Sequence, residues 1–267
     1  MIDLHALLAD LRDEGAELDA WLTDLPARAW HTPTPAARWT IAHQVAHLAW
    51  TDDRALLSAA DPDAFVADPD AFVAEATRAL GDPTGFVDRG AEEGATRDPA
   101  ELLAAWRTGR DRLADTLAHV PPGTKLLWYG PPMSPASMAT ARLMETWAHA
   151  GDVAAALDIP REPTRRLRHI AHLGVRTRDF AYLARALPIP AAEFRVELAA
   201  PDGETWTWGP QGAPQRITGS AHDFCLLVTQ RVHRDDTDLE SEGADAHHWL
   251  RIAQAFAGPP GTGRPRS

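Results

Sequence analysis

Hydrophobic residues recur every three or four positions through most of the first 160 residues, which is the spacing of amphipathic helices. Thr40 is a suitable N-cap, and Asp98-Pro99 places an N-cap before a proline at the first helical position. The pattern predicts four long helices, over residues 3–24, 40–57, 98–117 and 136–156. Four such helices with one extended connection favour a four-helix bundle.

Two segments interrupt this helical pattern. Residues 61–97 contain three Asp-Pro pairs, so we expect a broken segment with helical pieces around residues 64–80. Residues 120–135 contain five prolines, which cannot continue a helix, so we expect a rigid loop there.

The pattern changes after Pro163. A further helix is expected over 167–187, and Ser220 with Asp223 resembles the capping box of another helix. Polar and apolar residues alternate with a period of two in segments that predict strands, at 194–198, 204–208 and 216–218. A last helix is expected over 244–256, and the Pro/Gly/Arg-rich end of the chain is expected to be disordered.

These elements define the expected fold class, which is α+β and predominantly helical. We expect a helical bundle over residues 1–160 and a small α+β domain over 164–258, followed by a disordered tail over 259–267.

Composition excludes several classes of function. The 26 Lys and Arg against 38 Asp and Glu give a net charge of −12, so nucleic acid and anionic membranes are unsuitable partners. Cys225 is the only cysteine, which excludes an intramolecular disulfide and a cysteine-rich zinc site. No apolar run has the length of a membrane span and no signal-peptide pattern opens the chain, so we expect a cytoplasmic protein. The 12 histidines remain as the feature most relevant to chemistry.

Candidate chemistry lies on the predicted helix 136–156. Glu145, His149 and Asp152 fall within about 60° of one another around that helix. Burying a carboxylate and an imidazole without partners costs several kcal/mol, and a metal ion would remove that cost. A third ligand could come from His43 or His47 on the second helix, and periodicity alone does not choose between them. Spacing alone also leaves open that these are ordinary packed or solvated residues.

Three runs of residues resemble a known family. Trp39-Thr40-x4-Val45-Ala46-His47-Leu48-Ala49 is similar to the first motif of DinB-like bundles of the mycothiol-dependent maleylpyruvate isomerase group. Arg142-Leu143-Met144-Glu145-x3-His149-x2-Asp152-Val153 is similar to the second motif. Residues 219–231 resemble the start of a helix in that group's second domain. The chain also resembles an actinobacterial subgroup of uncharacterised metal-binding proteins, through residues 253–260.

The resemblance implies a DinB-like bundle with His47, Glu145 and His149 as metal ligands, and it disfavours His43. Asp152 is better placed as an acceptor that orients His149 or His47 than as a fourth ligand, and the alternative is an acid on the helix surface. Arg231 matches an arginine near the family's active site, where it would clamp a substrate carboxylate. The alternative is that Arg231 extends an apolar stripe and snorkels, or pairs with the carbonyl groups at the end of its helix.

The resemblance implies a divalent-metal-dependent enzyme that activates a low-molecular-weight thiol, mycothiol in actinobacteria, for isomerisation or S-transfer on a small electrophile. Zinc is the first choice of metal, with nickel, iron and manganese open. Two alternatives remain: a hydrolase, lyase or cyclase that uses metal-bound water, and a non-catalytic metal-binding stress module. Compared with the family's isomerases, the long segments 61–97 and 120–135 should change the shape of the entrance to the metal-site pocket. We therefore expect a substrate other than maleylpyruvate. The sequence allows a monomer or a homodimer.

Overall fold

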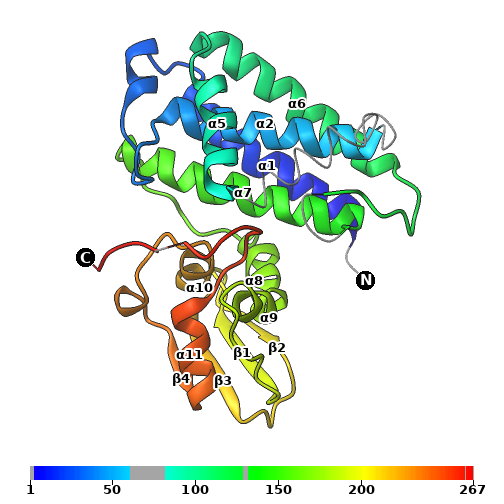
Figure 1. Cartoon of the computed structure of the whole chain (residues 1–267), viewed down its shortest axis with the longest axis vertical. Helices are drawn as coiled ribbons and strands as arrows, with labels where there is room; N and C mark the ends of the chain where they lie inside the picture. The colour runs from blue at the N-terminus through cyan, green and yellow to red at the C-terminus, as the bar shows by residue number, and fades with distance from the viewer. Residues whose placement is uncertain (1–2, 61–81, 129–131, 262, 267) are drawn as a thin grey trace. The chain divides into compact units, whose positions relative to one another are not determined.

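A computed structural model describes residues 3–60, 82–128, 132–261 and 263–266 of the 267-residue chain. The chain forms two compact units, Met1–Arg161 and Glu162–Ser267 (Figure 1). Among the described residues, no helix is both long and apolar enough to cross a membrane.

The first unit is helical. A short 3-10 helix, Ala27–His31, joins its first two long helices. Helix α2 packs against α5, α6 and α7, and α1 packs against α6 and α7. The helices are α1 (Leu4–Leu22), α2 (Ile41–Ala60), α5 (Pro83–Ala95), α6 (Pro99–His119) and α7 (Pro135–Ala156). The predicted four-helix bundle is therefore confirmed in α1, α2, α6 and α7.

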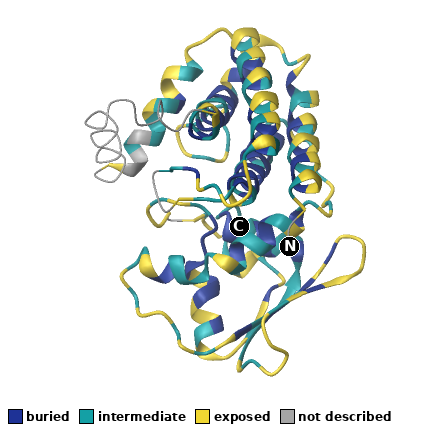
Figure 2. Ribbon diagram, turned by 90° about the vertical axis from the view of Figure 1, so that its right-hand side faces the viewer, coloured by how far each residue is buried: buried dark blue, intermediate teal, exposed yellow. Residues whose placement is uncertain are grey.

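The core of this unit fills the space between the four long helices. Leu18 of α1, Val45 of α2, Trp106 of α6 and Val153 of α7 are all almost fully buried. Figure 2 shows the buried positions along the inward faces of these helices and the exposed ones outside. Burial of this apolar stripe from each helix is the main favourable term for the bundle.

Helix α5 corrects the expectation of a broken segment over 61–97. Asp82 caps this helix by accepting from the Gly85 amide at 3.0 Å, and Pro83 takes its first position. The same Asp-Pro pair begins α6, with Asp98 as the N-cap, as the sequence predicts. An Asp-Pro pair thus begins a helix here rather than breaking one, because proline is tolerated at the first helical position. The helical pieces expected around 64–80 lie outside the described residues.

The second unit is a four-stranded sheet with helices. The strand order is β2-β1-β3-β4, with β1 parallel to β3 and antiparallel to β2, and with β4 antiparallel to β3. The elements are α8 (Leu167–Arg176), α9 (Arg178–Leu183), β1 (Phe194–Ala199), β2 (Thr205–Trp208), β3 (Gln215–Ser220), α10 (Ala221–Val228), a 3-10 turn (Arg234–Asp236), β4 (Glu240–Glu242) and α11 (Ala244–Ile252).

The α+β class and the three predicted strands are confirmed, and Ser220 caps α10 by accepting from the Asp223 amide at 3.0 Å. Strand β4 was missed, because Glu-Ser-Glu has no apolar alternation. The single helix expected over 167–187 is two helices, divided at Thr177, whose hydroxyl donates to the Leu173 carbonyl. Helix α11 ends at Ile252 instead of residue 256.

A buried ion pair joins α2 to α7 inside the first unit. Arg142 Nε donates to Asp52 Oδ1 at 2.8 Å, and both side chains are at most 5% exposed. The second arm of the guanidinium donates to Thr51 Oγ1 at 2.6 Å, and Thr51 in turn donates to the His47 carbonyl at 2.7 Å. The pair therefore holds the two helices together beside His47.

Replacing Arg142 with methionine leaves the Asp52 carboxylate buried without its partner. We expect Arg142→Met to lower the free energy of unfolding by about 3–5 kcal/mol, measured by urea denaturation. The matched control is Arg12→Met, which breaks an exposed pair with Asp115 and should cost less than about 1 kcal/mol. Equal losses in the two variants would contradict the role given to the buried pair.

Candidate metal centre

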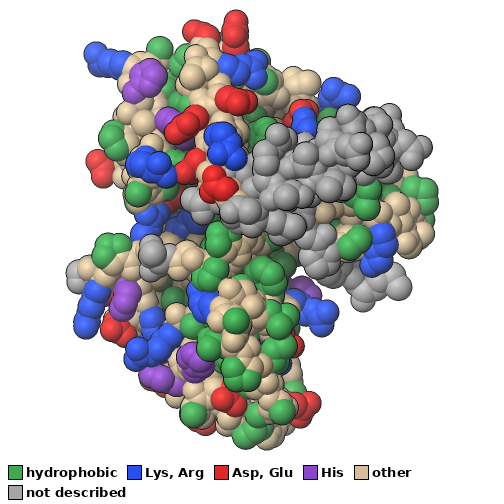
Figure 3. All heavy atoms as spheres, viewed as in Figure 1, with side chains coloured by type: hydrophobic (Ala, Val, Ile, Leu, Met, Phe, Trp, Pro, Cys, Tyr) green, Lys and Arg blue, Asp and Glu red, His purple; other side chains and the backbone are tan. Residues whose placement is uncertain are grey.

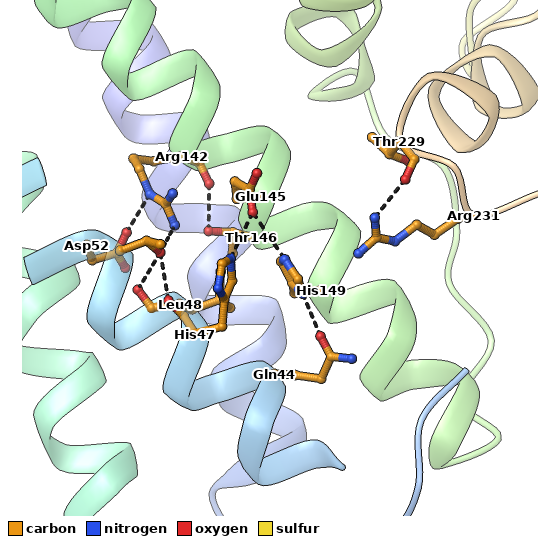
Figure 4. Close-up of polar contacts among 11 residues, drawn as sticks. Gln44, His47, Leu48, Asp52, Arg142, Glu145, Thr146, His149, Thr229 and Arg231 are labelled. Atoms are coloured by element: carbon orange, nitrogen blue, oxygen red, sulfur yellow. Dashed lines mark hydrogen bonds and ion pairs between the residues drawn. The ribbon is translucent and has the colours of Figure 1, made fainter. Parts of the chain in front are cut away.

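His47, Glu145 and His149 form one cluster, although 98 residues separate His47 from Glu145 in the chain (Figure 4). His47 comes from α2, and Glu145 and His149 lie one turn apart on α7. The Nε2 atoms of both histidines lie 3.1 Å from Glu145 Oε2. One candidate ligand atom from each residue lies within 4.8 Å of the other two. This donor set, two imidazoles and a carboxylate, is one that catalytic zinc sites use.

Glu145 is ionised within this cluster. Burial raises the pKa of its carboxyl group, but hydrogen bonds from His149 and His47 and their positive charge outweigh burial and hold the pKa well below its usual range. The side chain keeps 20% exposure, while those of His47 and His149 keep 8% and 11%. At neutral pH the cluster therefore presents a carboxylate at a site that is still reached by solvent.

Gln44 fixes the orientation of the His149 ring. The amide nitrogen of Gln44 donates to Thr34 Oγ1 at 2.8 Å, which turns the amide oxygen toward His149 Nδ1, 2.5 Å away. His149 Nδ1 is then a protonated nitrogen, and the other ring nitrogen, Nε2, faces Glu145 Oε2 at 3.1 Å. The contact between this nitrogen and the carboxylate oxygen is favourable only when a proton or a cation lies between the two atoms. The donor set thus fits a cation.

Gln44 faces His149 as the kind of acceptor that we expected Asp152 to be for His149 or His47, and the orienting role of Asp152 stays a prediction. Asp152 is buried on α7, but the acceptor that faces His149 Nδ1 is the amide of Gln44. Gln44 was missed by the sequence analysis. The signal that could have found it is a polar residue three positions before His47, on the same side of α2 and among buried apolar neighbours.

His47 and His43 differ in their surroundings. His47 Nδ1 is buried and has no hydrogen-bond partner among the described residues. His43 Nδ1 instead accepts from the Thr40 amide at 3.3 Å and lies 2.8 Å from Thr40 Oγ1, so it caps the start of α2. His43 is not one of the three clustered residues.

Trp39 forms an aromatic wall against the cluster. Its ring centroid lies 5.3 Å from that of His47 and 5.8 Å from that of His149, and it stacks on His149 at 20°. The indole nitrogen donates to Asp88 Oδ1 on α5 at 3.0 Å, and Arg38 donates to the other oxygen of Asp88 at 2.6 Å. Helix α5, which the sequence analysis did not predict, therefore holds Trp39 in place through Asp88.

Arg231 lies in the second unit, shortly after α10. One of its guanidinium nitrogens donates at 2.7 Å to the carbonyl of Thr229, the C-cap residue of α10, which is the contact that the alternative interpretation of Arg231 predicts. Gln230, directly before it, has a φ of +59°, which turns the chain sharply at this point. The structure thus brings together three of the five predicted site residues, with Asp152 buried on the same helix and Arg231 in the other unit.

The fold and the cluster define a class of protein: a helical bundle with a partly buried cluster of two histidines and one glutamate, followed by a small α+β unit. The family model described as mycothiol maleylpyruvate isomerase N-terminal domain matches residues 11–154, more than half of the chain. The chain belongs to this family. A second model, described as wyosine base formation, matches residues 190–241.

Similar whole proteins are known from Mycobacterium tuberculosis. Two of them, from strains CDC 1551 / Oshkosh and ATCC 25618 / H37Rv, are 56% identical to this chain over 264 residues, covering 99% of it and all of theirs. Both are described as uncharacterized. The crystal structures of the mycothiol-dependent maleylpyruvate isomerase and of its histidine-to-alanine mutant each match with a TM-score of 0.57 and 16% identity. Each match covers 90% of this chain and 93% of the other, which confirms the fold.

The contact between Gln44 and His149 can be tested through metal affinity. We expect Gln44→Leu to weaken zinc binding about tenfold to a hundredfold, because the His149 ring loses the acceptor that orients it. Competition with a chromophoric chelator measures the affinity. Asp152→Asn is the matched control and should have the smaller effect. A larger loss of zinc affinity in Asp152→Asn than in Gln44→Leu would show that Asp152, rather than Gln44, orients the ligand.

Proposed function

We propose that this protein is a divalent-metal-dependent enzyme that activates a low-molecular-weight thiol of the mycothiol type. The reaction is an isomerisation or S-transfer on a small electrophile that bears a carboxylate. The observation that carries the proposal is the convergence of His47, Glu145 and His149, in which the Nε2 atoms of both rings face one carboxylate oxygen. Family membership supports the choice of thiol, because the family is described by mycothiol.

The three clustered residues would hold the metal, and each has a defined part. Glu145 supplies a negative charge at neutral pH because its pKa is lowered, and Gln44 fixes the ring of His149. A divalent ion held there would lower the pKa of a thiol, so that the thiolate is available at neutral pH. Zinc suits two imidazoles and a carboxylate, and nickel, iron and manganese accept the same donors.

The nucleophilic sulfur in this proposal comes from a second molecule. Cys225 is the only cysteine of the chain, and it is fully buried with its thiol directed at the Leu167 carbonyl. Burial raises the pKa of this thiol well above its usual value, so Cys225 is not a thiolate at neutral pH. A site that activates an external thiol is consistent with a chain that offers none of its own.

Arg231 and Asp152 complete the proposed machinery. We assign Arg231 to the substrate carboxylate, because a planar guanidinium binds a carboxylate through two parallel hydrogen bonds. The bond from Arg231 to the Thr229 carbonyl holds one side of that group in place. Asp152 is assigned a positioning role from its buried place on α7, one turn after His149.

Metal content tests the proposed ligands directly. We expect His47→Ala, Glu145→Ala and His149→Ala each to lose most bound divalent metal, because a site with two remaining ligands binds weakly. Elemental analysis after dialysis measures occupancy, and circular dichroism checks folding. His43→Ala is the matched control: it removes a histidine one turn away on the same helix and should keep its metal. Full occupancy in the three ligand variants would show that the site is wrong.

Thiol binding tests the second part of the proposal. Protein loaded with cobalt(II) in place of the native ion should gain a thiolate-to-cobalt absorption band when mycothiol is added. S-methylated mycothiol, which cannot form a thiolate, should give no band. Metal occupancy without any band at saturating mycothiol would overturn thiol activation and leave a metal-dependent hydrolase, lyase or cyclase, or a non-catalytic metal-binding stress module.

A further inference from the structure

The second unit contains a pocket of about 240 Å³ that the proposed function does not use. Residues from the ends of α9 and α10, from the segment after α10, from α11 and from the C-terminal segment line it. Arg231 is not among the lining residues, although Gln230 and Val232 on either side of it are. Figure 3 shows arginine and histidine side chains gathered on this unit. The charged or imidazole-bearing lining residues are Arg185, His233, Arg234, Asp235, Arg251 and Arg264.

Three of these arginines have no carboxylate partner among the described residues. Arg185 donates to the Ala181 carbonyl and to Gln254 Oε1, at 3.2 and 3.4 Å. Arg234 donates to Thr237 Oγ1 and the Leu239 carbonyl, at 3.0 and 2.5 Å. Arg251 Nε donates to His247 Nε2 at 3.3 Å. None of the three forms an ion pair with a carboxylate of the described residues, so their charges are not compensated.

The single acidic residue of the lining has other partners. Asp235 lies 3.7 Å from an arm of Arg266 and 3.9 Å from His233 Nδ1. Burial lowers the pKa of Arg185, and no acidic neighbour raises it again. The pocket is thus strongly positive within a chain whose net charge is −12. Arg185 and Arg234 are partly buried. A partly buried charge without a counterion lowers the stability of the fold unless an anion binds beside it.

We propose that this pocket binds a small phosphate-bearing molecule. Arginines that line one pocket from different elements suit the several acceptor oxygens of a phosphate group, and a contact between a guanidinium and a phosphate is a charge-assisted hydrogen bond. The carbonyl and hydroxyl partners of Arg185 and Arg234 hold these two side chains in place before a ligand arrives. The volume lies below the ~300–1,000 Å³ of sites for drug-sized ligands, which favours a small metabolite over a peptide or a nucleic acid.

Inorganic pyrophosphate is the probe, titrated calorimetrically into the full chain. The protein is first freed of metal with EDTA, because pyrophosphate also binds divalent ions, and the buffer has low ionic strength. We expect saturable binding at one site. Arg185→Gln and Arg251→Gln should each weaken it about tenfold or more, since each removes a charge-assisted hydrogen bond. Arg251 is exposed, so its replacement leaves the core intact even if Arg185→Gln unfolds the unit.

The matched control is Arg165→Gln in the same unit. Arg165 pairs with Asp202 and Glu204 on the surface and does not line the pocket, so its loss should leave pyrophosphate binding unchanged. Equal weakening in the control would show non-specific attraction and overturn the proposal. The absence of saturable binding, or equally tight binding of succinate, would overturn it as well.

Discussion

The contact face between α2 and α7 is the constraint on which the candidate site depends. Three polar contacts cross it in antiparallel order: Gln44 with His149, His47 with Glu145, and Asp52 with Arg142 (Figure 4). Each contact lies about one turn from the next on both helices, so a shift of either helix by one turn would break all three. Polar groups buried between helices are stable only when they satisfy one another, which makes this register specific.

The three contacts differ in how complete they are. The outer two are closed by a salt bridge and by an amide that accepts from a ring nitrogen. In the middle contact, Glu145 Oε2 faces two imidazole nitrogens at 3.1 Å, and Gln44 holds the His149 ring in that orientation. The two outer contacts therefore keep His47, Glu145 and His149 in fixed positions, in which the three side chains could bind a cation. Preorganisation of this kind is what a metal site needs from its surroundings.

The two units carry opposite local charge. In the first unit an ionised glutamate and two imidazoles fit a cation, whereas in the second unit uncompensated arginines surround a pocket that fits an anion. The net charge of −12 reveals neither feature, because each depends on which side chains have partners and which do not. Local compensation, rather than total charge, decides what each site can bind.

The sequence by itself determined the helical bundle, the α+β class, three of the strands and the motifs that identify the family. These follow from periodicity, capping residues and short runs, which are local properties of the chain. It also placed Glu145 and His149 on one helix face, and the family motif selected His47 over His43.

Only the tertiary structure decided which residues meet across helices. Gln44 of α2 faces His149, Trp39 packs against both histidine rings, and Asp88 of α5 accepts a hydrogen bond from the Trp39 indole. The physical reason is that periodicity tells which face of a helix is buried but not which residue of another helix lies opposite. Strand β4 was not predicted for a related reason, since its position depends on pairing with β3 and not on its own residues.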